Sequence, residues 1–288
     1  MTPPPPEVLH AFGLQGSPRP IPGGRDLCYQ VGPVVLKPSD DDDEVQWLSE
    51  LAAELLRRAP TSYRLAAPFP LVAAPGRYLF DGWSASSFVS GTSRREGRFE
   101  ELFRASRAFH ADLAALVHEK PVVVGKQANR WNKADRVVWG ESTLDEIDGV
   151  NEEMLVRFQP LLDKLGRLTK ALPVGVKSQL VHADMFGNVL FDDAATSPAI
   201  IDLTFYWRPA EYANAVVVAD ALAWAGAGRG LVELYGTDEL RLQLLVRAMH
   251  WRYLTFVVDT DLAWVRENLH KADYETAVNV VGSFLKPS

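Results

Sequence analysis

The chain has 288 residues, of which 47% are hydrophobic and 23% are charged, and its formal net charge is −7. The apolar fraction is too high for a disordered protein, and 20 Gly and 19 Pro without a repeat exclude a collagen-like structure. The acidic balance argues against nucleic acid or an anionic membrane as a partner, because both would be repelled at long range. The length suits one large domain or two lobes of a folded protein.

The cysteine count and the N-terminus bear on the cellular compartment. The single cysteine, Cys28, allows no intramolecular disulfide and no cysteine cluster for zinc, which favours a reducing cytoplasm. Residues 1–7 have neither the basic start nor the apolar core of a secretion signal. The longest apolar run, residues 213–227, contains Asp220 and falls short of the ~20 residues that a membrane helix needs. We therefore predict a cytoplasmic protein.

The first part of the chain has the pattern of a small antiparallel sheet with one long helix. A short helix and four extended segments are expected, over residues 8–12, 27–31, 34–37, 78–80 and 86–89. Between the second and third of these strands, an acidic run, residues 40–43, leads into apolar residues at helical spacing, which predict a helix over residues 44–58. The acidic run is interpreted as a helix start that the helix dipole favours, rather than as a metal site.

The sequence changes character at residues 91–97, a segment rich in Ser, Arg and Gly. Beyond it, apolar residues at helical spacing predict two helices, and a helical region runs from Ala213 almost to the end. Three short strands are expected near residues 179–181, 189–191 and 199–201. The chain is therefore predicted to be an α+β protein with a small lobe, residues 1–92, and a larger, mainly helical lobe, residues 93–288.

The densest group of polar residues lies between two apolar segments. His182, Asp184 and Asn188 share one short turn, and a further carboxylate, Asp202, ends the next apolar run. A carboxylate at a buried strand end costs free energy unless it meets a cation or hydrogen-bond donors. Two Asp and one Asn converging on one pocket would suit Mg²⁺, which prefers a few oxygen ligands completed by phosphate and water.

This arrangement resembles the catalytic loop of the aminoglycoside phosphotransferase family, a branch of the protein-kinase-like fold, in which His-x-Asp precedes a metal-binding Asn and a strand-terminal Asp. From Pro22 to the helices after Asp220 the order of features is also similar: a Gly-Gly turn, a Val-Val-Leu-Lys strand, an acidic helix and a linker. The chain is similar as well to an actinobacterial subgroup of phosphotransferase-like proteins. The resemblance implies a two-lobed fold, with nucleotide bound by residues 1–92 and the catalytic loop and acceptor site in residues 93–288.

The resemblance further implies an ATP-dependent, Mg²⁺-dependent kinase that phosphorylates a hydroxyl of a small molecule. Phosphoryl transfer passes through a loose transition state, so the protein mainly positions groups and neutralises charge. In that role Asp184 would accept the hydrogen bond, and eventually the proton, of the acceptor hydroxyl. Asn188 and Asp202 would hold Mg²⁺ against the nucleotide phosphates.

The family also implies roles for residues of the small lobe. Lys37 would contact the α and β phosphates and be oriented by a helix glutamate, which we take to be Glu44, with Glu50 as the alternative. Gly23 and Gly24 would let backbone amides approach the phosphates without hindrance from a Cβ.

Two departures from the family pattern keep other hypotheses open. Three residues separate Asp184 from Asn188 where the family usually has four, and Ala183 stands where Gly is common. The second hypothesis is a degenerate kinase-like protein that binds nucleotide or a protein partner without transferring phosphate. A metal-dependent hydrolase using His182, Asp184 and Asp202 ranks third, because the other histidines form no spaced motif.

Several further residues have two interpretations. His182 is expected to hydrogen-bond the loop backbone rather than act as an acid or base. Asp220, inside an apolar helix, is expected to have a buried partner and to brace the loop region. The aromatic residues 205–207 suit either an acceptor pocket or the core, and Trp83 suits either an adenine site or hinge packing. The acceptor stays open among sugars, amino alcohols, nucleosides and peptide hydroxyls.

Overall fold

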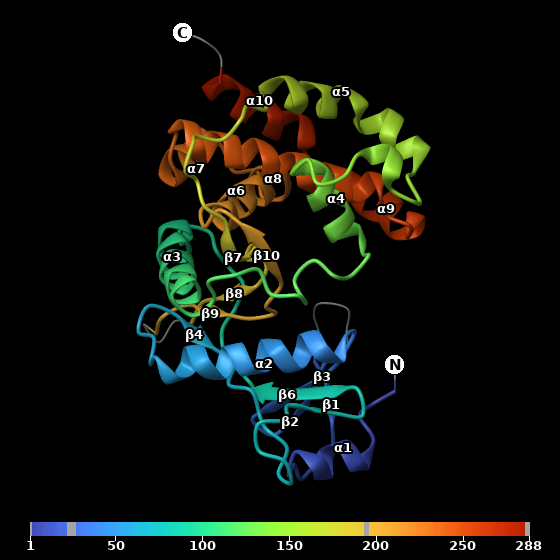
Figure 1. Ribbon diagram of the computed structural model, residues 1–288, viewed down its shortest axis with the longest axis vertical. Coiled ribbons are helices and arrows are strands. Elements are labelled where there is room, and N and C mark those ends of the chain that lie inside the picture. Colours follow the sequence, from blue (N-terminus) through green and yellow to red (C-terminus); the bar gives the residue numbers. More distant parts are fainter. Residues whose placement is uncertain (1, 22–26, 193–195, 286–288) are drawn as a thin grey trace. The chain divides into compact units, whose positions relative to one another are not determined.

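The computed structural model describes residues 2–21, 27–192 and 196–285 (Figure 1). The helices of this part of the chain are α1 (Pro6–Ala11), α2 (Asp42–Arg57), α3 (Phe99–Leu116), α4 (Arg130–Val138), α5 (Glu152–Leu168), α6 (Tyr212–Trp224), α7 (Arg229–Tyr235), α8 (Glu239–Val257), α9 (Leu262–Asn268) and α10 (Tyr274–Phe284). The strands are β1 (Arg19–Pro20), β2 (Tyr29–Val31), β3 (Val34–Pro38), β4 (Arg64–Leu65), β5 (Leu79–Phe80), β6 (Trp83–Ser87), β7 (Gln179–His182), β8 (Val189–Leu190), β9 (Ala199–Ile200) and β10 (Phe205–Arg208). Two 3₁₀ turns occur at Leu144–Glu146 and Leu269–Lys271.

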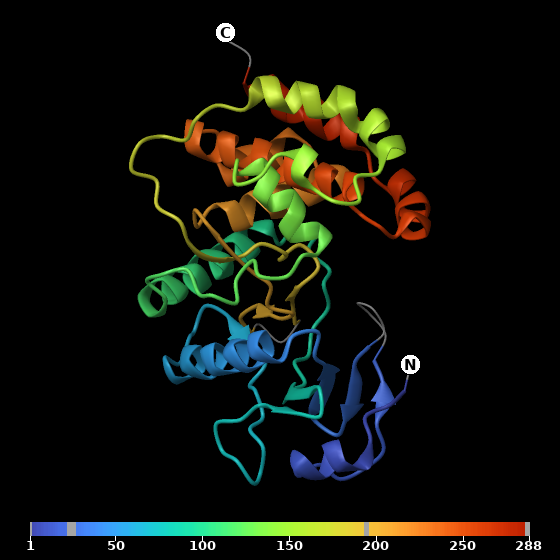
Figure 2. The same cartoon turned by 45° about the vertical axis from the view of Figure 1, so that its right-hand side comes forward.

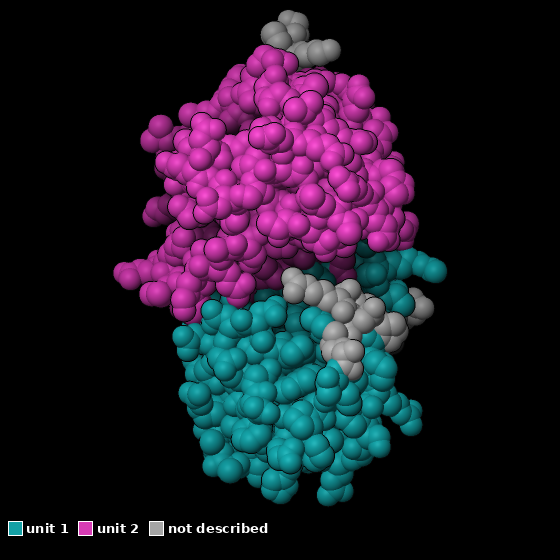
Figure 3. Space-filling model, turned by 90° about the vertical axis from the view of Figure 1, so that its right-hand side faces the viewer, with its two compact units in different colours: residues 1–95, 188–203 teal, residues 96–187, 204–288 magenta. Residues whose placement is uncertain are grey.

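The chain divides into two compact units, which Figure 3 shows in different colours. The first unit contains residues 1–95 and 188–203, and the second contains residues 96–187 and 204–288. The hairpin β8–β9 thus groups with the N-terminal strands although it follows them by a hundred residues or so in the chain. The functions predicted for the two lobes stay predictions.

A five-stranded antiparallel sheet, in the order β1-β2-β3-β6-β5, forms much of the first unit. Because successive side chains of a strand point to opposite faces, one face of this sheet collects the apolar residues. That face is buried with α1 in a single cluster of Val8, Phe12, Val31, Val34, Leu36 and Ala85. Lys37 follows Leu36 on β3 and therefore lies on the opposite face.

The strands expected over residues 27–31 and 34–37 are β2 and β3, and their predicted antiparallel pairing is confirmed. The strand expected over residues 86–89 begins earlier than predicted. It runs from Trp83 to Ser87 as β6, because its register pairs Trp83 with Pro38 and Ser87 with Val34 across the whole of β3. The hydrogen-bonded partner sets these ends, and the partner is invisible to a local apolar pattern.

The acidic run begins α2, as predicted. The side chain of Asp41 is the N-cap and accepts a hydrogen bond of 3.0 Å from the backbone N–H of Glu44. The carboxylates of the first turn lie at the positive end of the helix dipole, which stabilises them there. The apolar side of the helix buries Leu51, Ala52 and Leu55.

The second unit is built around α6 and α8, which pack closely against each other; Figure 2 shows the helices of this unit from a second direction. Every residue of α6 from Tyr212 to Ala223 is buried, so this helix has no polar face and lies in the core. Strands β7 and β10 form an antiparallel ribbon in which Phe205 faces His182. Phe205 and Tyr206 are buried, so their place is in the core. Among the described residues, no helix is both long and apolar enough to cross a membrane.

Candidate active site

The side chain of Lys37 forms an ion pair with Asp202, a residue 165 positions later in the chain. Both belong to the first unit, and both side chains are about half exposed. Burial disfavours the charged amine, but the carboxylate of Asp202 outweighs it and raises the pKa of Lys37. The structure therefore pairs a fixed positive charge with the strand-terminal carboxylate that the sequence singled out.

Asn188 and Asp202 lie at the same end of the β8–β9 hairpin. The register pairs Val189 with Ile200, and one step further the backbone N–H of Ile201 donates to the carbonyl of Asn188 at 2.9 Å. Asp202 follows directly and has a backbone φ of 52°, in the left-handed region that a non-glycine residue enters at a cost. Such strain is often retained where a side chain must point in one direction for function.

The oxygen atoms of Asp202 and Asn188 are suitable ligands for a hard divalent cation, but they are too few to fill its coordination shell without phosphate and water. Asp202 supplies carboxylate oxygens and Asn188 an amide oxygen, which are donors that Mg²⁺ accepts. Within the described part of the chain, no group of three or more His, Cys, Asp or Glu residues could hold a metal ion by itself. Mg²⁺ typically uses one or two protein oxygens and completes its shell with phosphate and water, so the donor set fits a metal that arrives with a nucleotide.

The structure tests the other residues of the predicted nucleotide site to different extents. Gly23 and Gly24 lie outside the described residues. Glu44 is in the first turn of α2, and its pairing with Lys37 stays a prediction, because the carboxylate that Lys37 meets in this structure is Asp202. The alternative, Glu50, accepts a hydrogen bond of 2.7 Å from the side chain of Gln46 one turn earlier.

Asp184 belongs to the second unit and forms an ion pair with Arg252 of α8. The Nη2 of Arg252 donates to Oδ1 of Asp184 at 2.9 Å, and the same guanidinium holds Asp220 through Nε at 2.9 Å and Nη2 at 2.6 Å. The buried partner expected for Asp220 is thereby confirmed. Burial works against the charge of Arg252, yet the two carboxylates raise its pKa above the ordinary value. Sequence reasoning missed Arg252, although the apolar surroundings of Asp220 signalled that a cation was needed.

Two histidines fix the start of the loop that carries Asp184. The backbone N–H of His182 donates to Nε2 of His110 on α3 at 2.9 Å, and Nδ1 of His110 lies 2.7 Å from the carbonyl oxygen of Ser106. His110 is therefore the neutral tautomer with its proton on Nδ1. The Nδ1 of His182 lies 3.1 Å from the carbonyl oxygen of Thr204, so the expected backbone role of His182 is confirmed.

Acid is expected to destabilise the protein through His110. Burial lowers the pKa of His110 to about 4, so the folded state disfavours the imidazolium. The unfolded chain then binds more protons at pH values between about 6.5 and 4, and the free energy of unfolding decreases as the pH falls through this window, by at most about 3 kcal/mol. Urea unfolding across the window measures this slope. The His110→Gln variant keeps a donor and an acceptor without titrating, and should flatten the slope.

The matched control for this prediction is His10→Gln, which changes an exposed histidine. His250 remains in both variants, and burial lowers its pKa to about 4 as well, so the pH dependence should be reduced rather than abolished. An unchanged slope in His110→Gln would show that His110 does not titrate in this way.

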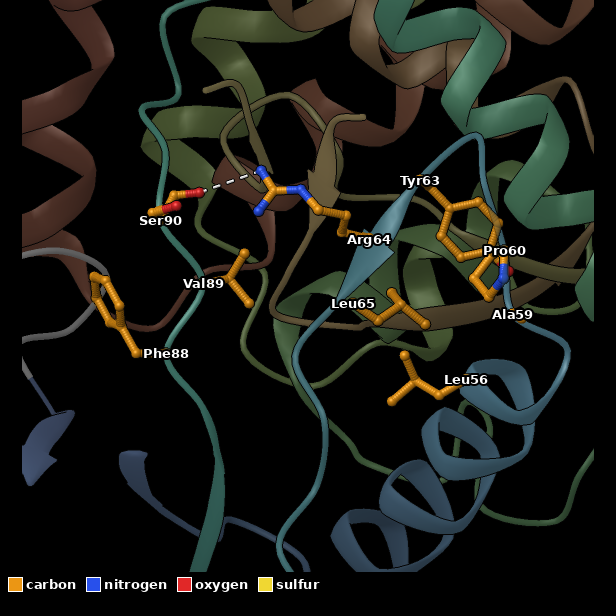
Figure 4. A pocket seen from close by; sticks show the side chains of 9 residues that line it. All are labelled: Leu56, Ala59, Pro60, Tyr63, Arg64, Leu65, Phe88, Val89 and Ser90. Atoms are coloured by element: carbon orange, nitrogen blue, oxygen red, sulfur yellow. Dashed lines mark hydrogen bonds between the residues drawn. The ribbon is translucent and has the colours of Figure 1, made fainter. Parts of the chain in front are cut away.

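The first unit also contains a pocket of about 410 Å³ between the end of α2, β4 and the segment after β6 (Figure 4). Arg64 lines this pocket. Its Nε donates a hydrogen bond to the carbonyl of Ser197 at 2.7 Å, and its Nη2 donates to the carbonyl of Ser90. None of the described candidate residues lines this pocket. It is therefore separate from the ion pair of Lys37 and Asp202.

Solved structures with a similar fold match nearly the whole chain. Spectinomycin phosphotransferase APH(9)-Ia in complex with ADP and spectinomycin has a TM-score of 0.56 and 17% identity, covering 96% of each chain. The microcompartment-associated aminopropanol kinase has a TM-score of 0.57 and 14% identity, covering 97% of this chain and 94% of that one. A thermostable mutant of aminoglycoside phosphotransferase APH(4)-Ia with ADP and hygromycin B has a TM-score of 0.58 and 13% identity, covering 97% and 96%.

No protein-family model and no curated protein sequence matches the chain. TM-scores of 0.56 to 0.58 establish a common fold, whereas identities of 13 to 17% leave the activity to the residues of this chain. The likeness inferred from the His-Ala-Asp loop and the Ile-Ile-Asp strand is confirmed at the level of the fold. The chain has the α+β, protein-kinase-like fold of the aminoglycoside phosphotransferases and related small-molecule kinases.

Proposed function

We propose that the chain is an ATP-dependent phosphotransferase that moves the γ-phosphate to a hydroxyl of a small molecule with the help of Mg²⁺. The observation that carries this proposal is the meeting of Lys37 with Asp202 beside Asn188 in the first unit. A cation for phosphate oxygens, a carboxylate for a metal and an amide for the same metal are the groups that phosphoryl transfer requires on the nucleotide side.

The ion pair also suggests how ATP would be received. Phosphate oxygens could replace the carboxylate as the partner of Lys37, and Asp202 would then be available to hold Mg²⁺ beside the nucleotide. A metal held there would neutralise charge at the phosphates. Gly23 and Gly24 keep their proposed role in bringing backbone amides to the phosphates, and Glu44 its proposed role in orienting Lys37.

On the acceptor side, Asp184 is the proposed base. Its side chain is 46% exposed, so it is accessible to a hydroxyl, while the loop before it is anchored through His182 and His110. Neighbours of similar fold are solved with spectinomycin or hygromycin B beside ADP, and another is an aminopropanol kinase, which supports a small molecule as the acceptor.

The test measures nucleotide binding and ATP consumption separately. Thermal unfolding with ATP, with Mg²⁺ and with both should show the largest stabilisation with both together. ATP consumption is then followed with a panel of sugars, amino alcohols, nucleosides and hydroxyl peptides. Absence of any stabilisation by nucleotide would contradict the proposal, and stabilisation without turnover on the whole panel would favour the degenerate, nucleotide-binding alternative.

ATP is expected to protect Cys28 from alkylation. The thiol is partly buried and is close enough to Lys37 and Asp202 for their charges to act on it. It is also the single cysteine of the chain, so the modified protein carries the label at one known position. Mass spectrometry of native protein treated with iodoacetamide should show slower modification with ATP and Mg²⁺ than without. The Lys37→Met variant is the control, and protection that persists in it would place the nucleotide elsewhere.

A further inference from the structure

The guanidinium of Arg252 is held by a buried carboxylate and by two neighbouring indole rings. Along the edge, Asp220 accepts two hydrogen bonds, and the side chains of Arg252 and Asp220 are only 11% and 8% exposed. The indole rings of Trp251 and Trp131 lie close to the guanidinium, with their centroids 4.5 and 5.3 Å from Cζ. Contacts of this kind favour a guanidinium and restrict its rotation. Arg252 is thus a rigid group on a core helix.

From this fixed position Arg252 reaches Asp184, which lies on a segment without regular secondary structure. One nitrogen, Nη2, serves both Oδ2 of Asp220 and Oδ1 of Asp184. The contact ties an oxygen of the proposed base to α8, so the orientation of its carboxylate depends on a helix rather than on the loop alone.

The stability of the fold does not account for this contact. The buried carboxylate of Asp220 needs Arg252, because a buried charge without a partner is costly. Asp184 is 46% exposed, so water screens its ion pair with Arg252, and the contact adds less to stability than the buried one with Asp220. A role in the reaction explains why the contact is made.

We propose that Arg252, anchored by Asp220, is a positioning residue that orients the carboxylate of Asp184 toward the acceptor hydroxyl. The inference rests on the proposed function. In a loose transition state the base does little covalent work and acts mainly by orienting the nucleophile. A carboxylate free to rotate would present its oxygens in several directions, and a misplacement of about 1 Å in such a group can lower the rate by about 100-fold.

The first test removes Arg252 together with its buried partner. The double variant Asp220→Leu with Arg252→Met replaces a buried ion pair by apolar side chains, which is often neutral for stability. We expect its melting temperature and its stabilisation by ATP and Mg²⁺ to stay near those of the wild type, the KM for ATP to be unchanged, and kcat to fall by about 100-fold. The control is Arg247→Met on the same helix, a buried arginine whose hydrogen bonds run to Gln243 and to the carbonyl of Lys170.

The second test uses chemical rescue. In Arg252→Ala the carboxylates of Asp220 and Asp184 remain, and added guanidinium ion at a concentration that does not denature the protein should restore part of kcat. The same addition should leave Arg247→Ala unchanged. Recovery of kcat beyond any recovery of the melting temperature indicates positioning, whereas a structural role alone would recover the two together.

The outcomes separate the two proposals. A wild-type protein that consumes no ATP with any acceptor defeats the proposed function and the positioning role together. An active wild type whose double variant keeps its kcat defeats the positioning role alone. Equal losses of kcat and melting temperature in the double variant and in Arg247→Met, with no guanidinium rescue of Arg252→Ala, would also overturn it.

Discussion

The Asp184→Asn variant is expected to transfer phosphate about 10³-fold more slowly than the wild type while it binds ATP equally well. The amide has the size of the carboxylate, but it cannot take the proton of the acceptor hydroxyl. The side chain is 46% exposed, so weakening its ion pair with Arg252 should not unfold the protein. ATP consumption with the best acceptor of the panel measures the rate, and thermal unfolding with ATP and Mg²⁺ measures binding.

Asp238→Asn is a closely matched control for this variant. Asp238 is 49% exposed and, like Asp184, forms an ion pair with an arginine of α8, here Arg241. Its side chain caps the start of α8, and because Asn is as good an N-cap as Asp, the change should alter stability little and leave the transfer rate near that of the wild type. Full activity of Asp184→Asn would remove Asp184 from the reaction.

The second large effect is expected for Asp202→Ala, which should lose the part of ATP stabilisation that depends on Mg²⁺. At an ATP concentration 100 times its Kd, binding stabilises a folded protein by about 2.7 kcal/mol. Without the carboxylate, Mg²⁺ loses its charged protein ligand, so adding the metal to ATP should give little further stabilisation. ATP alone should bind no worse than in the wild type, because Lys37 is freed from the carboxylate that competes with phosphate.

Comparison with Lys37→Met separates the two roles. That variant should lose stabilisation by ATP both with and without Mg²⁺, because the cation that meets the phosphates is gone. Asp192→Ala in the same unit, whose carboxylate accepts a hydrogen bond from Ser90, is the control for removing a carboxylate outside the ion pair. A Mg²⁺ effect that survives in Asp202→Ala would show that the metal is held by other residues.

Elements with a strong local signal were predicted well. The helix of residues 44–58 has a cap, an acidic first turn and apolar residues at helical spacing, and α2 spans Asp42–Arg57. The strands beside the His-Ala-Asp loop were also expected at nearly their observed positions, because each is a short apolar run between turn residues. These signals act between residues that are close in the chain.

Elements that depend on distant partners were missed. The two residues of β4 form a strand because Arg64 and Leu65 pair in parallel with Ala199 and Ile200 of β9. Helix α4 is mainly polar, and its packing depends on an ion pair of its buried Asp135 with Arg208 of β10, which no spacing within α4 reveals. Such elements carry too little local preference to be recognised before the fold brings their partners together.

The candidate site shows the same division. Spacing and residue type were sufficient to single out Lys37, Asp184, Asn188 and Asp202, because the motif is a pattern along the chain. The need of Asp220 for a buried partner was also evident, but the sequence offers both Arg247 and Arg252 on one helix. The packing of α6 against α8 selects Arg252, since only the tertiary structure determines which side chains share a buried position. The sequence by itself determines that Lys37 carries a positive charge and Asp202 a negative one. Because these residues are 165 positions apart in the chain, only the packing of the folded chain determines that they form an ion pair.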